Sequence, residues 1–109
     1  MEAPEQPEAA GAEYELHLYI AGNTPSAAAA VRNLQDICER YLAGRVELRI
    51  IDLSAQPEAA GEEQIVASPT LVKKRPGLTR FLVGDLSDRR RVLALLGLTP
   101  DAHDPYLHD

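Results

Sequence analysis

The alternation of side chains between residues 13 and 20 constrains this chain more than any other feature. Apolar residues stand at every second position from Tyr14 to Ile20, and Glu, His and Tyr fill the positions between them. Because successive side chains of a strand point to opposite faces, this period of two predicts a strand with one strongly apolar face. The fold therefore starts from a sheet that is buried on at least that face.

A helix and a second strand are predicted to follow directly. Thr24 is placed to cap the helix, Pro25 suits its first position, and Gly44 is a candidate C-cap. Residues 46–53 are rich in β-branched side chains and predict a strand, and the intervening helix predicts that the two strands run parallel. One face of the helix is expected to be buried, because apolar residues recur every three or four positions: Ala27, Ala30, Val31, Leu34, Ile37, Cys38, Tyr41 and Leu42.

Residues 57–66 predict a second helix of low intrinsic stability. Gly61 lies in its interior and costs about 1 kcal/mol relative to alanine, and only Ile65 and Val66 supply large apolar side chains. Pro69 ends the segment, because the residue before a proline avoids the helical region.

The rest of the chain predicts a hairpin and a last helix. Residues 70–74 and 79–83 read as its two strands, with Pro76 and Gly77 at the central positions of a type II turn. The last helix is expected to begin at Ser87 as N-cap with Leu86 as a hydrophobic staple, and to end at Gly97. Its expected buried face comprises Val92, Leu93, Leu95 and Leu96.

The predicted order βαβαββα is typical of an α/β thioredoxin-like fold, with a mixed four-stranded sheet and helices on both faces. The domain is expected to span residues 13–98. Residues 1–12 are rich in Pro, Glu, Ala and Gly and predict a flexible acidic tail, and residues 99–109 predict a second tail.

The corner after the first strand lacks the residues for thiol chemistry. Redox members of the thioredoxin-like class carry Cys-x-x-Cys there, whereas this chain has Ala21-Gly22-Asn23-Thr24-Pro25. Its only cysteine, Cys38, falls on the apolar side of the first helix and is expected to be buried and inert. We therefore expect a binding protein and no enzyme.

Composition argues against several other classes of function. The net charge of -6 disfavours general binding to nucleic acid. There is no apolar run of about 20 residues to span a membrane and no signal peptide, so we expect a cytoplasmic protein. Acidic residues gather near the start of the chain, whereas most of the cations fall in one stretch: Lys73, Lys74, Arg75, Arg80, Arg89, Arg90 and Arg91. Two readings of that stretch remain open, docking on an acidic protein surface and a solvated face.

No motif predicts a cofactor or a metal. There is no glycine-rich phosphate loop, and His103 and His108 lie beside aspartates in the second tail, where such residues are usually solvated. Ser26 has no histidine near it in the sequence to activate it. Asp52 ends the second strand and is read as an acid that initiates a turn, in preference to a carboxylate that meets a neighbouring loop or a ligand.

Four segments together resemble the KaiB family of circadian clock proteins, over residues 14–98. They are Leu18-Tyr19-Ile20-Ala21-Gly22-Asn23-Thr24-Pro25, Ile50-Ile51-Asp52-Leu53, Ala67-Ser68-Pro69-Thr70-Leu71 and Gly84-Asp85-Leu86-Ser87-Asp88-Arg89. The resemblance implies a protein without enzymatic activity that binds the hexameric ATPase KaiC and, in cyanobacteria, sequesters KaiA. It also implies a metamorphic protein, with a ground state that is usually tetrameric and has the order βαββααβ, and a rare thioredoxin-like monomer that binds KaiC.

The resemblance also places the functional residues. It implies a KaiC-binding surface made by Glu62, Glu63, Gln64, Ala67, Pro69 and Lys73, with Gln64 where a lysine is common. It places the change of fold in the second half of the chain. Cyanobacterial members usually have glycine at the position of Leu95 and an acidic residue at that of Gly97. Leucine forms helices better than glycine and Gly97 suits a C-cap, so both differences favour the thioredoxin-like state, and Pro69 is a third residue expected to affect the switch.

Two functions remain from this reasoning. The first is a clock-type adaptor of a KaiC ATPase ring that modulates its phosphorylation or ATPase state, with a KaiA-like protein or a histidine kinase as further partners. The alternative is a redox-inactive thioredoxin-like module for interaction or stress signalling outside a clock, similar to the input domain of the histidine kinase SasA. A redox enzyme is disfavoured by the corner without cysteine.

Overall fold

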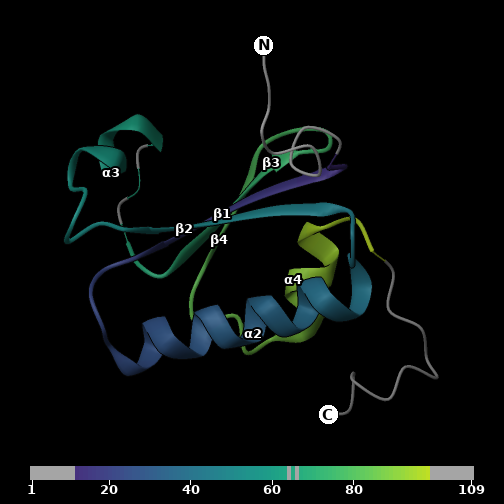
Figure 1. Cartoon of the computed structure of the whole chain (residues 1–109), viewed down its shortest axis with the longest axis horizontal. Helices are drawn as coiled ribbons and strands as arrows, with labels where there is room; N and C mark the ends of the chain where they lie inside the picture. Colours follow the sequence, from purple (N-terminus) through teal and green to yellow (C-terminus); the bar gives the residue numbers. More distant parts are fainter. Residues whose placement is uncertain (1–11, 64, 66, 99–109) are drawn as a thin grey trace.

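A computed structural model describes residues 12–63, 65 and 67–98 of the chain. Its elements follow the predicted order βαβαββα (Figure 1): β1 (Tyr14–Ile20), α2 (Pro25–Tyr41), β2 (Val46–Asp52), α3 (Glu58–Glu63), β3 (Thr70–Arg75), β4 (Arg80–Val83) and α4 (Arg89–Leu95). The prediction of seven elements in this order is confirmed. No described helix has the length and apolar character needed to cross a membrane.

The four strands form one mixed sheet in the order β2-β1-β3-β4. β1 pairs with β2 in parallel, and β3 pairs antiparallel with both β1 and β4. The predicted α/β class and the mixed four-stranded sheet are therefore confirmed. β2 and β4 are the two edge strands.

The two faces of the sheet are covered unequally. In Figure 1, α2 and α4 lie below the sheet, and α3 lies on the other side near one end. Leu16 and Leu18 are fully buried in a cluster with residues of α2 and α4, whereas Tyr19 belongs to a smaller cluster with Ala59 of α3. The period of two in β1 thus sends its side chains into two separate cores, the larger of which lies under α2 and α4.

α2 begins as predicted and ends slightly earlier than predicted. The Thr24 hydroxyl accepts a hydrogen bond of 3.1 Å from the backbone N–H of Ala27, and Pro25 is the first helical residue. The helix ends at Tyr41 with Leu42 as its C-cap. Gly44, predicted as the cap, has a φ of +75° in the turn that follows.

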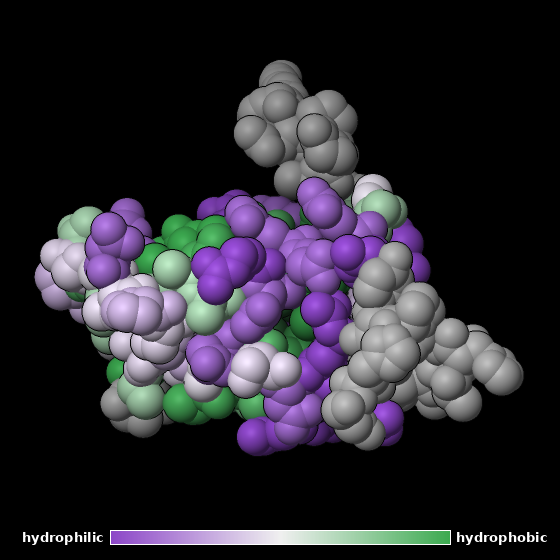
Figure 2. Space-filling view, turned by 90° about the horizontal axis from the view of Figure 1, so that it is seen from below, coloured by the Kyte–Doolittle hydropathy of each residue, from purple (hydrophilic) through white to green (hydrophobic). Residues whose placement is uncertain are grey.

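Seen from the side of α2 and α4, hydrophilic residues dominate the middle of the surface (Figure 2).

α4 begins one residue later than predicted. The N-cap is Asp88, whose carboxylate accepts from the backbone N–H of Arg91 at 3.3 Å. Ser87, the predicted cap, uses its own backbone N–H to donate to Asp85 Oδ1 at 3.0 Å. An aspartate and a serine are both good caps, so the sequence alone did not separate two adjacent candidates. Leu86 is buried in the same cluster as Val92, in keeping with its expected contact with the start of the helix.

Gly97 ends α4 as predicted. Its φ is +76°, its N–H donates to the Ala94 carbonyl at 3.1 Å, and the N–H of Leu98 donates to the Leu93 carbonyl at 2.8 Å. These two bonds form a Schellman motif, in which the residue after the cap needs a left-handed backbone. Leu93 and Leu98 belong to the same apolar cluster, which completes the motif.

Candidate partner-binding surface

The corner between β1 and α2 is held by a carboxylate. Asp52 Oδ1 accepts from the N–H of Gly22 at 3.0 Å, and from the N–H and hydroxyl of Ser54 at 3.0 and 2.6 Å. The Ser54 hydroxyl first, and then the two backbone amides, hold the pKa of Asp52 below its usual value. Asp52 therefore starts the next turn, as predicted, and it also joins the end of β2 to the neighbouring corner, which was the less favoured alternative. At the corner where redox members of the class carry cysteines, the backbone of Gly22 thus makes a structural contact with this carboxylate.

The thiol of Cys38 is buried and unreactive. Cys38 is 7% exposed within the cluster under α2. Burial raises its pKa to about 11, so it is protonated at neutral pH. A protonated, buried thiol is a poor nucleophile. The prediction that Cys38 packs as a small apolar residue is confirmed.

α3 lies on the sheet through few contacts. Ala59 packs with Tyr19 and Val72, and the partly buried Ile51, Leu53 and Ile65 extend this small cluster. The described helix spans six residues, which is shorter than the predicted segment 57–66. Its acidic end comes from Glu62 and Glu63, and Gln64 lies outside the described residues. Val66 also lies outside the described residues, and the low intrinsic stability of this segment stays a prediction.

The turn after α3 is built around Pro69. The Ser68–Pro69 peptide bond is cis, Pro69 is buried, and its carbonyl accepts from the N–H of Gly84 at 2.9 Å. The Thr70 hydroxyl donates to the Ala67 carbonyl at 2.7 Å, which closes the turn. Ala67 and Ser68 are exposed at its tip. The turn therefore presents a small exposed surface on a fixed base.

Lys73 lies elsewhere. It is 5% exposed, and its ammonium donates to the carbonyls of Pro76 and Leu78 in the hairpin loop, the second at 2.8 Å. Strand alternation puts Lys73 on the same side as Leu71, towards α2 and α4. The structure thus brings Glu62, Glu63, Ala67 and Pro69 to one end of the sheet, and it does not bring Lys73 to that surface.

The residues expected to affect a change of fold sit at the end of α4 and in the turn. Leu95 is the last helical residue and packs partly buried against the larger cluster, and Gly97 forms the cap described above. Both fit a stable α4. Pro69 is distant from them in sequence but supports the strand that lies beside β4.

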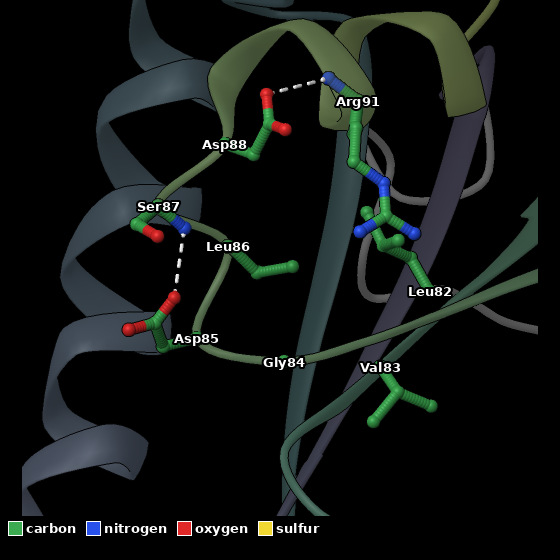
Figure 3. Close-up of a pocket in the computed structure, with 8 residues that line it drawn as sticks. All are labelled: Leu82, Val83, Gly84, Asp85, Leu86, Ser87, Asp88 and Arg91. Carbon is green, nitrogen blue, oxygen red and sulfur yellow. Dashed lines mark hydrogen bonds between the residues drawn. The ribbon is translucent and has the colours of Figure 1, made fainter.

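A small pocket of about 160 Å³ lies at the loop between β4 and α4 (Figure 3). The Asp85 and Asp88 carboxylates in its wall already accept hydrogen bonds from the backbone of Ser87 and Arg91. The Ser87 hydroxyl is the main cause that holds the pKa of Asp85 below its usual value. These two carboxylates therefore stabilise the loop and the start of α4. Within the described residues, no three His, Cys, Asp or Glu side chains form a group that could hold a metal.

Sequence reasoning missed a feature of β4. Phe81 and Val83 are 50% and 55% exposed on the side of the sheet that carries α3. The only signal in the sequence was that this strand reads as the last in a hairpin, and last strands are often edge strands.

Comparison with known proteins places the chain in a family. The model of the family described as KaiB domain matches residues 17–98. "Circadian clock oscillator protein KaiB" of Prochlorococcus marinus (strain MIT 9303) is 47% identical over 88 residues, which cover 81% of this chain and 74% of that protein. The protein of the same name from Synechococcus sp. (strain RCC307) is 47% identical over 85 residues, 78% of this chain and 77% of the relative.

Solved structures show the same fold at low identity. The N-terminal domain of Synechococcus elongatus SasA superposes with a TM-score of 0.62 at 23% identity, over 91% of this chain and 95% of that domain. The thioredoxin Deadhead of Drosophila melanogaster gives a TM-score of 0.67 at 15% identity, over 84% of this chain and 86% of that one. The predicted thioredoxin-like fold is therefore confirmed.

Proposed function

The chain belongs to the KaiB family, and we propose that it is a non-catalytic clock adaptor that binds a KaiC-type ATPase ring and modulates its phosphorylation or ATPase state. The observation that carries this proposal is the 47% identity over 88 residues to a circadian clock oscillator protein KaiB. The corner without cysteine and the buried Cys38 support a role in binding. We place the protein in the cytoplasm, with a KaiA-like protein or a histidine kinase as further partners.

The surface proposed for the ATPase is the acidic end of α3 with the turn that follows. In this proposal Glu62, Glu63 and Gln64 are the polar contact residues, and the exposed Ala67 is the apolar one. Pro69 fixes the path of the turn from beneath. Lys73 acts indirectly in this proposal, because its ammonium holds the hairpin loop at the other end of β3.

A change of fold is part of the proposal. The thioredoxin-like fold is the form that binds the ATPase, and it exchanges with a homo-oligomeric form, tetrameric or dimeric, of order βαββααβ. Leu95 and Gly97 favour the thioredoxin-like form, because a leucine and a glycine cap stabilise α4. Pro69 belongs to the half of the chain that would rearrange.

The test is a binding measurement with the KaiC-type ATPase of the same host, with ATP and without it. We expect a complex that elutes with the ATPase ring in gel filtration. Ala67→Arg should weaken it at least tenfold, because an interface core rejects an unpaired charge. Ala43→Arg, the same change at an exposed residue of the turn after α2, is the matched control and should leave binding unchanged.

No binding under either nucleotide condition would contradict the proposal and would favour an interaction module outside a clock. Equal weakening by Ala67→Arg and Ala43→Arg would keep the ATPase as partner but move the interface away from the turn.

A further inference from the structure

In the part of the chain that the structure describes, β4 presents an open backbone edge. It is the outermost strand of the sheet, beyond β3. The N–H of Gly84 donates to the Pro69 carbonyl, and the register then makes Leu82 the next residue of β4 to bond with β3. Because bonding alternates along an antiparallel ladder, the backbone groups of Phe81 and Val83 point to the open side. They are available to another strand.

The side chains of β4 differ on the two faces of the sheet. Phe81 and Val83 are half exposed on the face that carries α3. Leu82 lies on the other face and packs against the larger cluster. The side chains of a strand added at this edge would therefore lie beside Phe81 and Val83 on one face of the sheet. On the other face they would lie beside Leu82.

An open groove of about 600 Å³ adjoins that second face. Its apolar lining residues are Phe81, Leu82, Ala94 and Leu95, and its charged lining residues are Arg80 and Arg91. Figure 3 shows the Arg91 side chain extending from α4 towards Leu82. The groove is thus lined by both apolar and basic side chains.

The two groove arginines differ from other cations of the basic stretch. Arg75 pairs with Glu15 at 2.7 Å, and Arg89 pairs with Asp36 at 2.9 Å. In the part of the chain that the structure describes, neither Arg80 nor Arg91 has an ion-pair partner for its guanidinium. Burial first, and then the charge of Arg80, lower the pKa of Lys73. Within the described residues no ion pair therefore neutralises these two guanidinium groups, although Asp85 and Asp88 line the adjoining pocket with Arg91.

We propose that the free edge of β4 binds an extended segment of a partner protein in which acidic and apolar residues alternate. Its backbone pairs with Phe81 and Val83, its acidic side chains face Arg80 and Arg91, and its apolar side chains cover the exposed Phe81 and Val83. Main-chain pairing gives affinity in such strand addition, and alternate side chains give specificity.

A second copy of the chain fits this edge poorly. If two β4 strands paired, the arginines of one groove would approach those of the other, and like charges at close range across a strand pair are destabilising. Charge complementarity favours an acidic segment. This inference does not rest on the proposed ATPase partner.

The probe is a labelled nine-residue peptide of alternating glutamate and valine, measured by fluorescence anisotropy against the full chain. A peptide of the same composition with its glutamates grouped at one end controls for charge alone. We expect the alternating peptide to bind at least fivefold more tightly than the grouped one, and its binding to weaken as salt rises. The amides of Phe81 and Val83 should gain protection from hydrogen exchange.

Two variants test the two contacts. Val83→Pro removes one outward N–H without removing a bond to β3, and Arg91→Glu reverses one groove charge. Each should weaken the alternating peptide about tenfold. Arg32→Glu makes the same charge change at an exposed residue of α2 and should change binding by less than about twofold. Val83→Thr keeps the N–H and should bind like the parent.

Absence of peptide binding would overturn the proposal. Equal binding of the two peptides, or equal weakening by Arg91→Glu and Arg32→Glu, would also overturn it, because each result would indicate attraction by net charge alone. Concentration-dependent self-association that Val83→Pro abolishes, with no peptide bound, would assign the edge to a second copy and contradict the proposed partner.

Discussion

The two faces of the sheet differ in how many buried side chains pack between the sheet and its helices. Among the described residues, thirteen buried side chains form the cluster beneath α2 and α4, whereas three form the cluster beneath α3. Segments with few buried contacts open at low free energy, while the main core opens only with global unfolding. We therefore expect the face beneath α2 and α4 to maintain the fold, and the face beneath α3 to change its contacts more readily.

The helices on the two faces differ in the same sense. α2 has 17 residues, a capped start and five buried side chains. α3 has six residues and a glycine in its interior. An isolated helix of that length is unstable in water, so α3 depends on Ala59 and its few neighbours. The proposed ATPase surface thus lies on the less stable side.

The largest effect should come from the main core. Leu18 is fully buried, and Leu18→Ala should lower the free energy of unfolding by about 2 to 5 kcal/mol, because it removes apolar contacts and leaves a cavity. Leu78→Ala makes the same chemical change at a residue that is 76% exposed and should cost under about 0.5 kcal/mol. Urea denaturation measures the free energy of unfolding of both variants. Similar decreases in the two would contradict the assignment of Leu18 to the main core.

The next effect concerns the cap of α4. Gly97 has a φ of +76°, so Gly97→Ala should destabilise the protein by roughly 1 kcal/mol through backbone strain. Chemical shifts of residues 92–96 should also lose helical character if the cap maintains α4. A variant as stable as the parent would contradict the Schellman geometry.

A glycine-to-alanine substitution in α3 should have the opposite effect on stability. An added Cβ at Gly61 meets no atom within 4 Å, and its backbone is helical. Gly61→Ala should therefore stabilise α3 by about 0.5 to 1 kcal/mol and slow the exchange of its amides up to about fivefold. The global free energy of unfolding should change less than local exchange does. An equal gain in both would indicate that α3 opens only when the whole domain unfolds.

The smallest effect should appear at the junction between β2 and the corner. The pKa of Asp52 is lowered, chiefly by the Ser54 hydroxyl, so its charged form is favoured in the folded state. Its contribution to stability is present above the unfolded pKa of about 4 and is lost as pH falls through the lower folded pKa. Asp52→Asn should be less stable than the parent at pH 7, with a gap that closes in acid. Thermal melts from pH 7 down to pH 2 measure this gap, and a constant gap would refute the role.

The order of elements could be predicted from the sequence because local signals carried it. The alternation in β1, the cap at Thr24 and the glycine at Gly97 each act within a few residues. The parallel pairing of the first two strands followed from the helix between them, whereas the register of the sheet and the division of the core came from the structure. The low stability of α3 was visible in Gly61.

Other features required contacts between distant parts of the chain. Lys73 looked like a surface cation, but its ammonium reaches loop carbonyls that the hairpin brings back to it. The groove beside β4 forms only when α4 packs against that strand, which brings Arg80 of β4 and Arg91 of α4 to the same groove. The choice of Asp88 over Ser87 as cap depended on how Asp85 folds back on the loop.

Amide hydrogen exchange of the chain, alone and bound to the KaiC-type ATPase of its host, decides whether the less stable face of the sheet is the one that binds the ATPase. We expect fast exchange in α3 and slow exchange in α2 without the ATPase, and strong new protection of α3 and the turn at Ala67 in the complex. Equal protection of α2 and α3 in the isolated chain, or new protection confined to α2 in the complex, would contradict it.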